Sequence, residues 1–195
     1  MNLTTERLIL RDFVESDWEA VWTYQQDPLY LRYNAWTERT PGAVRAFVQM
    51  FLDHQKQDPR VKFQFAVTLK STGQLIGNCG VRRNSAEAHE GDMGYELDPD
   101  HWGKGYATEA ARAVLHFGFS HMSLHRICAS CIAENTGSAH VLEKLGMQQE
   151  GRLRENEYFK DRWWDTLLYA ILYDEWQALH NNLLLKSDIH GNKLK

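Results

Sequence analysis

Cysteine and positive charge are both scarce in this sequence of 195 residues. Three cysteines are an odd count and a poor basis for a disulfide framework, as is typical of a reducing compartment. The 26 acidic residues outnumber the 22 basic ones, and the net charge of -4 argues against a general nucleic-acid binder. No stretch reaches the roughly 18 consecutive apolar residues of a membrane-spanning helix, and the polar N-terminus carries no signal sequence. We therefore expect a cytoplasmic protein that binds neither nucleic acid nor membrane.

The residues that are abundant favour a folded domain. Hydrophobic residues make up 43% of the chain, and seven Trp and eight Tyr exclude a disordered protein. Apolar spacing predicts strands at residues 7–11, 63–67, 75–81, 93–97, 126–133, 151–159 and 164–172. It predicts helices at residues 17–24, 106–121 and 138–145, one that begins at 40–41, and one from 174 onward. The sequence thus predicts one α+β domain around a mixed sheet at residues 1–177, and a helix end with a polar tail at 178–195.

One stretch, residues 94–110, joins a strand to a long helix through a glycine-containing loop. The first backbone N–H groups of a helix have no partners inside it, and the helix dipole is positive there. Gly103 and Gly105 lack the Cβ atoms that would keep an anion away from those N–H groups. The loop therefore predicts a nest for phosphate before Tyr106, with Lys104 adding positive charge.

The same residues also fit an ordinary glycine turn that leads into a helix. Two other phosphate motifs fit poorly. A P-loop requires Ser or Thr directly after its lysine, but Gly105 follows Lys104. A Rossmann fingerprint requires Gly or Ala where Thr108 stands, and it opens a β-α-β unit. A nucleotide-binding enzyme of either type is therefore disfavoured.

The run Trp102-Gly103-Lys104-Gly105-Tyr106-Ala107 resembles the acyl-CoA signature of the GNAT acetyltransferase superfamily, Arg/Gln-x-x-Gly-x-Gly/Ala. Gly105 and Ala107 match the signature, whereas Trp102 departs from its usual Arg or Gln. Together with Thr5-Glu6-Arg7-Leu8 and Trp164-Asp165-Thr166, the likeness covers roughly residues 3 to 176. The likeness is greatest to the branch of the superfamily that contains ribosomal-protein N-terminal acetyltransferases.

The resemblance implies a mixed, mostly antiparallel sheet with flanking helices and one splayed pair of strands. It implies acetyl-CoA as the acetyl donor, with the pantetheine arm lying in the splayed opening much as an added strand would. The backbone N–H of Leu97 is then the candidate that polarises the thioester carbonyl. The residues implied to hold the diphosphate are Trp102, Gly103, Lys104, Gly105, Tyr106, Ala107 and Thr108.

A second segment, Glu134 to His140, resembles the Asn-x-x-Ser helix start that the superfamily places against the pantetheine arm. The amide of Asn135 offers both a donor and an acceptor for the arm, and the Ser138 hydroxyl lies at the helix start. Both residue types are also favoured helix caps, so capping alone is the alternative interpretation.

The attacking amine must be unprotonated, although α-amines titrate near ~7.7–8.0 and lysine near ~10.4, so a general base is expected. Two carboxylates are candidates for this base. For each of them, the alternative interpretation is an exposed strand carboxylate with no catalytic role. Glu96 lies on the strand that borders the opening. Glu157 is favoured slightly, because it matches a glutamate suspected as the base in the ribosomal-protein branch.

The leaving thiolate also needs a partner. Many relatives use a tyrosine at the position that Leu142 occupies here, so Ser138 is the substitute implied by resemblance and Tyr158 is a weaker one. Transfer is expected to be direct, in a ternary complex, with no cysteine nucleophile. Cys128 and Cys131 form a C-x-x-C within a strand pattern that sends the two thiols to opposite faces, so we expect no metal site.

The acceptor is expected to be a primary amine, either a protein N-terminus or a small molecule. Aromatic side chains from two variable segments are the candidates to line its side, although core packing is the alternative for each. These candidates are Tyr33, Trp36, Tyr158 and Trp163. The aromatic content also leaves a homodimer open. A catalytically inactive acyl-CoA-binding sensor or scaffold is the alternative function, because the expected tyrosine is absent.

Overall fold

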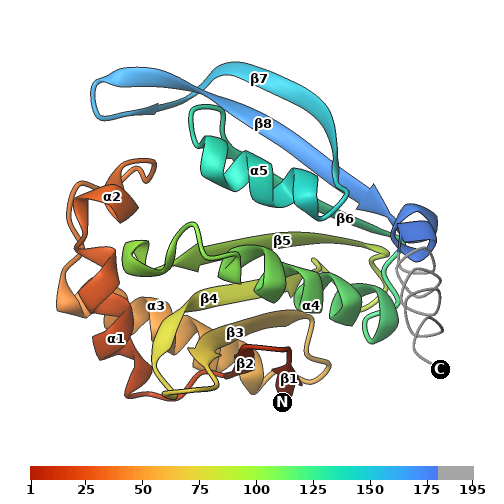
Figure 1. The fold of residues 1–195 in the computed structure, drawn as a ribbon, viewed down its shortest axis with the longest axis horizontal. Helices are drawn as coiled ribbons and strands as arrows, with labels where there is room; N and C mark the ends of the chain where they lie inside the picture. Colours follow the sequence, from red (N-terminus) through yellow and green to blue (C-terminus); the bar gives the residue numbers. More distant parts are fainter. Residues whose placement is uncertain (180–195) are drawn as a thin grey trace, which may run out of the picture.

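The computed structural model describes residues 1–179, which fold around one eight-stranded sheet of order β1-β2-β3-β4-β5-β6-β8-β7 (Figure 1). All neighbouring strands pair antiparallel except β5 and β6, which are parallel. The strands are β1 (Asn2–Thr4), β2 (Leu8–Asp12), β3 (Lys62–Leu69), β4 (Leu75–Arg82), β5 (Glu90–Leu97), β6 (Arg126–Ile132), β7 (Gln148–Phe159) and β8 (Arg162–Leu172). The mixed, mostly antiparallel sheet predicted from the sequence is confirmed.

Several helices begin where the sequence supplies a side-chain cap. Thr40 accepts a hydrogen bond from the Ala43 N–H at 3.2 Å, and Pro41 follows at the first helical position. Asn135 caps α5 in the same way, so this helix starts at Thr136, two residues before the predicted start at Ser138. The helices are α1 (Asp17–Gln25), α2 (Pro28–Leu31), α3 (Pro41–Gln55), α4 (Tyr106–Ser120) and α5 (Thr136–Lys144), with a 3-10 turn η1 (Pro99–His101).

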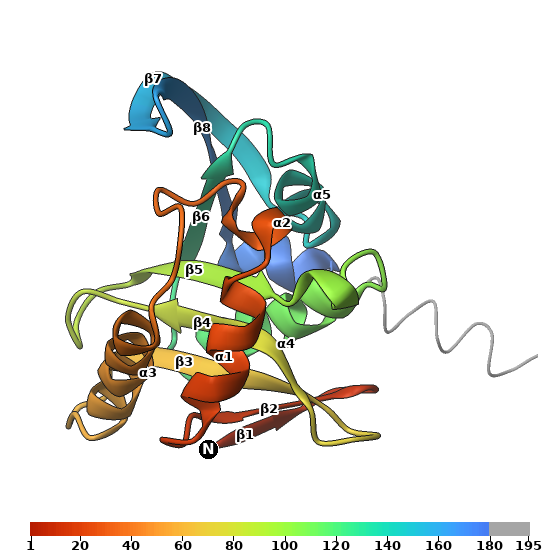
Figure 2. The same cartoon turned by 90° about the vertical axis from the view of Figure 1, so that its left-hand side faces the viewer.

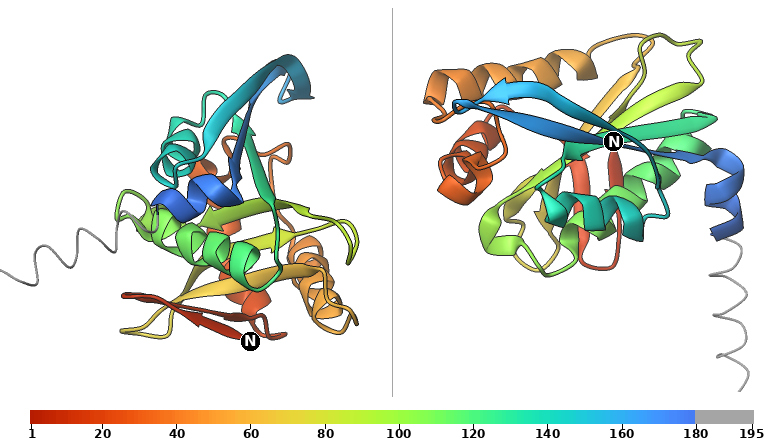
Figure 3. Two further views of the ribbon diagram at one scale, coloured as in Figure 1. Left: turned by 90° about the vertical axis from the view of Figure 1, so that its right-hand side faces the viewer. Right: turned by 90° about the horizontal axis from the view of Figure 1, so that it is seen from above.

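Helices cover both faces of the sheet, and each face has its own apolar core. Helices α4 and α5 pack on one face, where Phe65, Leu115 and Leu142 are fully buried. Helices α1 and α3 pack on the other face, where Val21 and Val44 are fully buried. Figures 2 and 3 show α3 and α4 on opposite sides of the central strands. Successive residues of a strand therefore point into different layers.

The parallel pair β5 and β6 separates along its length. Register holds only at the start of β5, where Glu90, Gly91 and Asp92 pair with residues 126–128. Beyond that point β6 stays paired with β8, while β5 stays paired with β4 up to Leu97. The second half of β5 thus has a neighbour on one side only, which is the splayed arrangement that the resemblance implied.

Several short features were not predicted from the sequence. They are the strand β1, the single turn α2 and the turn η1. The last hairpin turns on Lys160 and Asp161 alone, both with positive φ, so Arg162 belongs to β8 rather than to the turn. Residues 173–179 are helical, as expected for the segment after β8, whereas most of the predicted tail, residues 180–195, lies outside the described residues.

Candidate functional site

A cavity of about 600 Å³ lies where β5 separates from β6, between the start of α4, the start of α5 and the segment around α2. Of the residues proposed from the sequence, the following line it: Tyr33, Glu96, Leu97, Trp102, Gly103, Gly105, Tyr106, Ala107, Thr108, Asn135 and Ser138. Segments far apart in the chain therefore meet in one space.

The cavity is bordered by the unsatisfied start of α4. Gly103 and Gly105 have φ values of 71° and 81°, a left-handed conformation that glycine adopts without steric cost. Gly105 is the N-cap, and no side chain among the described residues bonds the first helical N–H groups. The N–H groups of Tyr106, Ala107 and Thr108 are the donors that an α-helix leaves without internal partners. An anion in this part of the cavity meets those donors and the positive end of the helix dipole.

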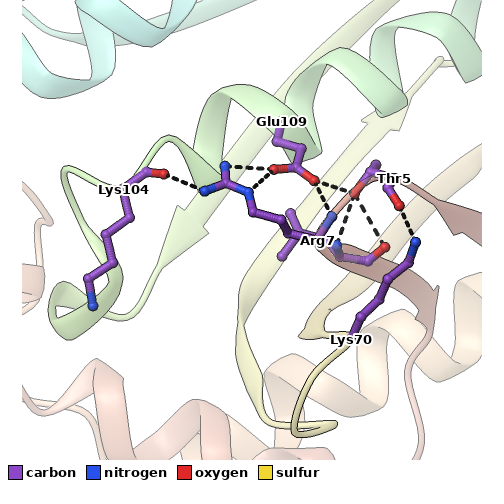
Figure 4. Close-up of polar contacts among 6 residues, drawn as sticks. Thr5, Arg7, Lys70, Lys104 and Glu109 are labelled. Atoms are coloured by element: carbon purple, nitrogen blue, oxygen red, sulfur yellow. Dashed lines mark hydrogen bonds and ion pairs between the residues drawn. The ribbon is translucent and has the colours of Figure 1, made fainter.

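Residues of the turn between β1 and β2 hold this loop and the first turn of α4 in place (Figure 4). The Arg7 guanidinium donates to Glu109 Oε2 at 2.7 Å and to the carbonyl oxygen of Lys104 at 3.0 Å. Thr5 Oγ1 donates to Glu109 Oε1 at 2.6 Å, and the Arg7 N–H donates to the same oxygen at 2.8 Å. Although partial burial alone would raise the pKa of Glu109, these hydrogen bonds from Thr5 and Arg7 lower it below its ordinary value. Arg7 also stacks over the Tyr106 ring, 4.5 Å from the ring centre.

Leu97 connects the splayed strand β5 to the loop at residues 98–105, which is called the phosphate loop below. The N–H of Asp98 donates to Ile76 O at 2.9 Å, and Gly77 lies opposite Leu97. Gly77 and Leu97 therefore form a non-hydrogen-bonded pair, and the backbone N–H and C=O of Leu97 point away from β4 into the gap. Trp102 Nε1 donates to that carbonyl at 2.8 Å. The residue that departs from the acyl-CoA signature thus ties the loop to Leu97.

The start of α5 forms the facing wall. Asn135 Oδ1 accepts from the Ser138 N–H at 3.1 Å, so its acceptor serves as the helix cap while its amide remains at the cavity. The Tyr95 hydroxyl donates to Ser138 O at 2.9 Å and lies 3.0 Å from Ser138 Oγ. Burial raises the pKa of Tyr95, against an opposing hydrogen bond from Ser138. Two hydroxyl groups therefore meet at this wall.

Glu96 points to the other layer, toward α1 and α2. Its Oε1 accepts from Tyr24 Oη at 2.7 Å, Gln25 Nε2 at 2.8 Å and Asn78 Nδ2 at 2.6 Å. Its Oε2 accepts from Tyr30 Oη at 2.6 Å. A carboxylate offers about four lone-pair sites, two on each oxygen. Oε1 is therefore fully used, and Oε2 has room for one more donor.

The two phenols around Glu96 stay protonated donors. Burial raises the pKa of Tyr24 and of Tyr30, and the nearby Glu96 carboxylate raises both further. Arg39 Nε donates to Gln25 Oε1 at 2.8 Å and holds that amide with its NH2 toward Glu96. Side chains from α1, α2 and β4 thus fix one carboxylate at the wall of the cavity.

Five residues proposed from the sequence do not line the cavity. The Lys104 ammonium turns back to Asp100 O at 2.8 Å. Glu157 is exposed on β7 opposite Trp164. Trp36 lies under the guanidinium of Arg39, and the rings of Tyr158 and Trp163 pack on each other with centroids 5.0 Å apart. The hairpin of β7 and β8 carries its residues beyond the cavity, because it extends past the last pairing of β6 with β8.

Sequence reasoning missed Tyr30, Tyr95 and the brace at Arg7. Asp27-Pro28 was an available signal for α2, because Asp27 accepts from the Leu29 N–H at 2.7 Å and Pro28 opens the helix. Strand alternation also separates Tyr95 from Glu96 on the two faces of β5. No sequence signal pairs Arg7 with Glu109, which lies 102 residues away.

None of the three cysteines lines the cavity, although the Cys131 side chain lies within hydrogen-bond reach of Ser138. Cys128 and Cys131 both lie on β6, in a strand as expected, and all three cysteines are free thiols. Within residues 1–179, no three His, Cys, Asp or Glu side chains are grouped so that they would hold a metal ion. The same residues contain no helix with both the length and the apolar character needed to cross a membrane.

Comparison with known proteins gives a consistent result. Residues 7–148 match the model of the acetyltransferase (GNAT) domain. The chain is 38% identical to the uncharacterized N-acetyltransferase YnaD of Bacillus subtilis over 90% of this chain and 99% of that protein. Its fold resembles the crystal structure of a GNAT-family acetyltransferase from Bacillus anthracis with a TM-score of 0.77 and 36% identity, over 89% and 99% of the two chains.

The fold is also shared with the ribosomal L7/L12 α-N-protein acetyltransferase RimL, whose structure is a complex with coenzyme A. The TM-score is 0.77 at 20% identity, over 90% of this chain and 99% of the other. The resemblance drawn from the loop at residues 102–107 is thereby confirmed: this chain belongs to the GNAT family of N-acetyltransferases.

Proposed function

We propose that this protein transfers the acetyl group of acetyl-CoA directly to a primary amine, either a protein N-terminal α-amine or a small-molecule amine. The observation that carries the proposal is the single cavity that joins the uncapped start of α4, the free N–H of Leu97 and the carboxylate of Glu96. Each of the three supplies one requirement of the reaction.

The start of α4 is the proposed diphosphate site. The donors are the N–H groups of Tyr106, Ala107 and Thr108, presented by a loop whose glycines leave them accessible. A structure with this fold holds coenzyme A, which supports the same ligand here. The pantetheine arm would lie in the gap beside β5, where the Leu97 N–H faces the thioester carbonyl and stabilises the negative charge that develops on its oxygen.

Glu96 is the proposed general base. Glu96 lines the cavity, and its Oε2 has one acceptor position beyond the bond from Tyr30, which could take a proton from the amine directly or through a water molecule. Glu157, which the sequence favoured slightly, is exposed on the hairpin and does not reach the cavity. The geometry therefore favours Glu96 over Glu157.

The reaction needs no covalent enzyme intermediate. The amine nitrogen attacks the thioester carbon, the C–S bond breaks, and one proton passes in net terms from nitrogen to sulfur. No cysteine is among the cavity-lining residues in the described part of the chain. Ser138, at the facing wall beside the Tyr95 hydroxyl, would lie on the side of the leaving sulfur.

The proposal is tested by calorimetry with acetyl-CoA, followed by measurement of free thiol release with a panel of amines. The panel contains peptides with ribosomal-protein N-termini, amino acids and polyamines, and mass spectrometry of cells with and without the gene identifies the physiological acceptor. We expect acetyl-CoA binding and thiol release that depends on one class of amine. Binding without release for every amine would indicate an inactive acyl-CoA-binding module, and no binding would overturn the proposal.

A further inference from the structure

We propose that Tyr95 donates the proton to the leaving sulfur of coenzyme A, and that Ser138 is a positioning residue that holds the Tyr95 hydroxyl. This inference rests on the proposed acetyl transfer and assigns a step that the carboxylate of Glu96 cannot perform. It is carried by the side chains at the wall between β5 and α5.

The first argument is placement. Tyr95 and Ser138 both line the cavity, and Tyr95 lies two residues before Leu97 on β5. Alternation along the strand points Tyr95 to the α4 and α5 layer, and Glu96 to the α1 and α2 layer. The N–H of Leu97 lies in the gap between these layers. A thioester at that N–H therefore has the carboxylate on one side and the phenol on the other.

The second argument is the hydrogen-bond geometry. The Tyr95 hydroxyl contacts Ser138 twice, at the backbone oxygen (2.9 Å) and at Oγ (3.0 Å). These contacts anchor the phenol to the capped first turn of α5, where Asn135 accepts from the Ser138 N–H. Leu142 of α5 occupies the position where many relatives carry a tyrosine. Its side chain is 1% exposed in the core and has no proton to give.

The third argument is acidity. A phenol is a much better proton donor than a serine hydroxyl, since only the phenol titrates in the range accessible to proteins. Burial raises the pKa of Tyr95 above its ordinary value of 10.0, so the phenol remains protonated at the alkaline pH where the amine acceptor is neutral. The donor and the nucleophile are thus both in their reactive forms at the same pH.

The proton that the amine loses and the proton that the sulfur gains balance over one reaction cycle. As the C–S bond breaks, its electron pair stays on sulfur. The Tyr95 hydroxyl turns its single proton from Ser138 O to that sulfur and can then accept from Ser138 Oγ. Glu96 Oε2 holds the proton lost by the amine and releases it to solvent, and solvent reprotonates the phenolate. One proton moves in net terms from the amine to the thiol, and no oxidant, reductant or metal is required.

The test compares Tyr95→Phe, Ser138→Ala and the double variant, using the acceptor found in the amine panel. We expect Tyr95→Phe to lower kcat about 100-fold while the Kd for CoA stays within about 2-fold, because only the transition state loses a contact. Ser138→Ala should lower kcat about 10-fold, and adding it to Tyr95→Phe should cost nothing further. The matched control is Tyr173→Phe, a phenol that packs against the same core and does not line the cavity, with kcat unchanged.

A second readout separates chemistry from structure. Replacing Tyr95 with a fluorinated tyrosine makes the phenol more acidic at nearly constant shape. We expect the alkaline limb of the kcat profile to move to lower pH, which a purely structural tyrosine would not cause.

Two results would overturn the assignment while leaving the proposed function intact. One is a Tyr95→Phe enzyme that keeps kcat within about 3-fold of the wild type, below the usual range for an acid catalyst. The other is a Ser138→Ala enzyme that loses as much activity as Tyr95→Phe. If the wild type binds CoA but transfers acetyl to no amine, the proposed function itself fails.

Discussion

The two sides of the cavity are held in different ways. On the proposed donor side, Arg7 and Thr5 of the β1–β2 turn bond Glu109 and Lys104 at 2.6 to 3.0 Å. On the acceptor side, the β7–β8 hairpin reaches the α2 segment through Lys160 Nζ and Leu31 O, 2.6 Å apart. The rings of Tyr33 and Trp164 meet there edge to face, with centroids 6.0 Å apart.

This difference suggests a division of labour. The diphosphate is the same in every turnover, so a loop fixed by several charged contacts costs no versatility. The segments proposed for the acceptor side carry exposed rings at Trp36, Tyr158 and Trp163, outside the cavity lining, and the hairpin tip bonds α2 through Lys160 and Leu31. A fixed donor site combined with a variable acceptor wall would allow proteins of the same fold to use many different acceptors. It predicts that variants on the two sides affect different kinetic constants.

The largest effect is expected at Glu96, where the two sides meet. Glu96→Gln should lower kcat by about 1,000-fold, because it removes the base while a similar shape remains. Glu157→Gln should change kcat by less than about 3-fold, because that side chain is exposed and remote from the cavity. Steady-state rates with calorimetric CoA affinities check both variants. A large loss for Glu157→Gln with little loss for Glu96→Gln would show that the sequence-based preference for Glu157 was the better one.

The next effect is expected at the phosphate loop. Gly105→Val places a β-branched side chain at a φ of 81°, which displaces the N–H groups at the start of α4. Losing one or two charge-assisted hydrogen bonds should weaken acetyl-CoA binding about 100-fold. Gly73→Val is the matched control, since Gly73 has a φ of 73° in the distant β3–β4 turn with open space around it. A similar loss of affinity in both variants would mean that strain alone, and not the nest, is responsible.

The phosphate loop could be predicted from the sequence because its parts are contiguous. Gly103, Gly105 and the start of α4 follow one another, and backbone donors need no particular side chain. The setting of Glu96 could not be predicted, since its donors lie 18 to 72 residues away and converge only through tertiary packing. Glu157 was favoured by a motif match, which reports residue type and not position in space, and its role as the base stays a prediction.

A smaller effect concerns stability and pH at Glu109. Its pKa in the folded protein is below the ordinary value of 4.5, so its stabilising contribution is present above pH 4.5 and is lost as pH falls through the folded value. Glu109→Gln should lower the free energy of unfolding at pH 7 by about 1–2 kcal/mol, discounted for the exposure of Arg7. Denaturation at pH 7 and at pH 3.5 should show that the difference in free energy of unfolding between the wild type and Glu109→Gln is smaller at pH 3.5. For the exposed control Glu6→Gln, this difference should be small and the same at both pH values. If the difference for Glu109→Gln did not depend on pH, the proposed stabilisation by the ion pair between Arg7 and Glu109 would be contradicted.

The smallest effect is expected at the tip of the hairpin. Lys160→Met removes the ammonium that bonds Leu31 O but keeps the apolar stem, so it loosens the acceptor wall at the cost of one hydrogen bond. That loss corresponds to about 1 kcal/mol, and we expect the KM for the acceptor to rise about 3- to 5-fold with the Kd for acetyl-CoA unchanged. Lys56→Met, at the exposed end of α3, is the control and should change neither constant. If the acetyl-CoA affinity of Lys160→Met fell in parallel with acceptor binding, the hairpin would also be supporting the donor side. The two walls would then have to be treated as one coupled unit rather than as a fixed site and an exchangeable one.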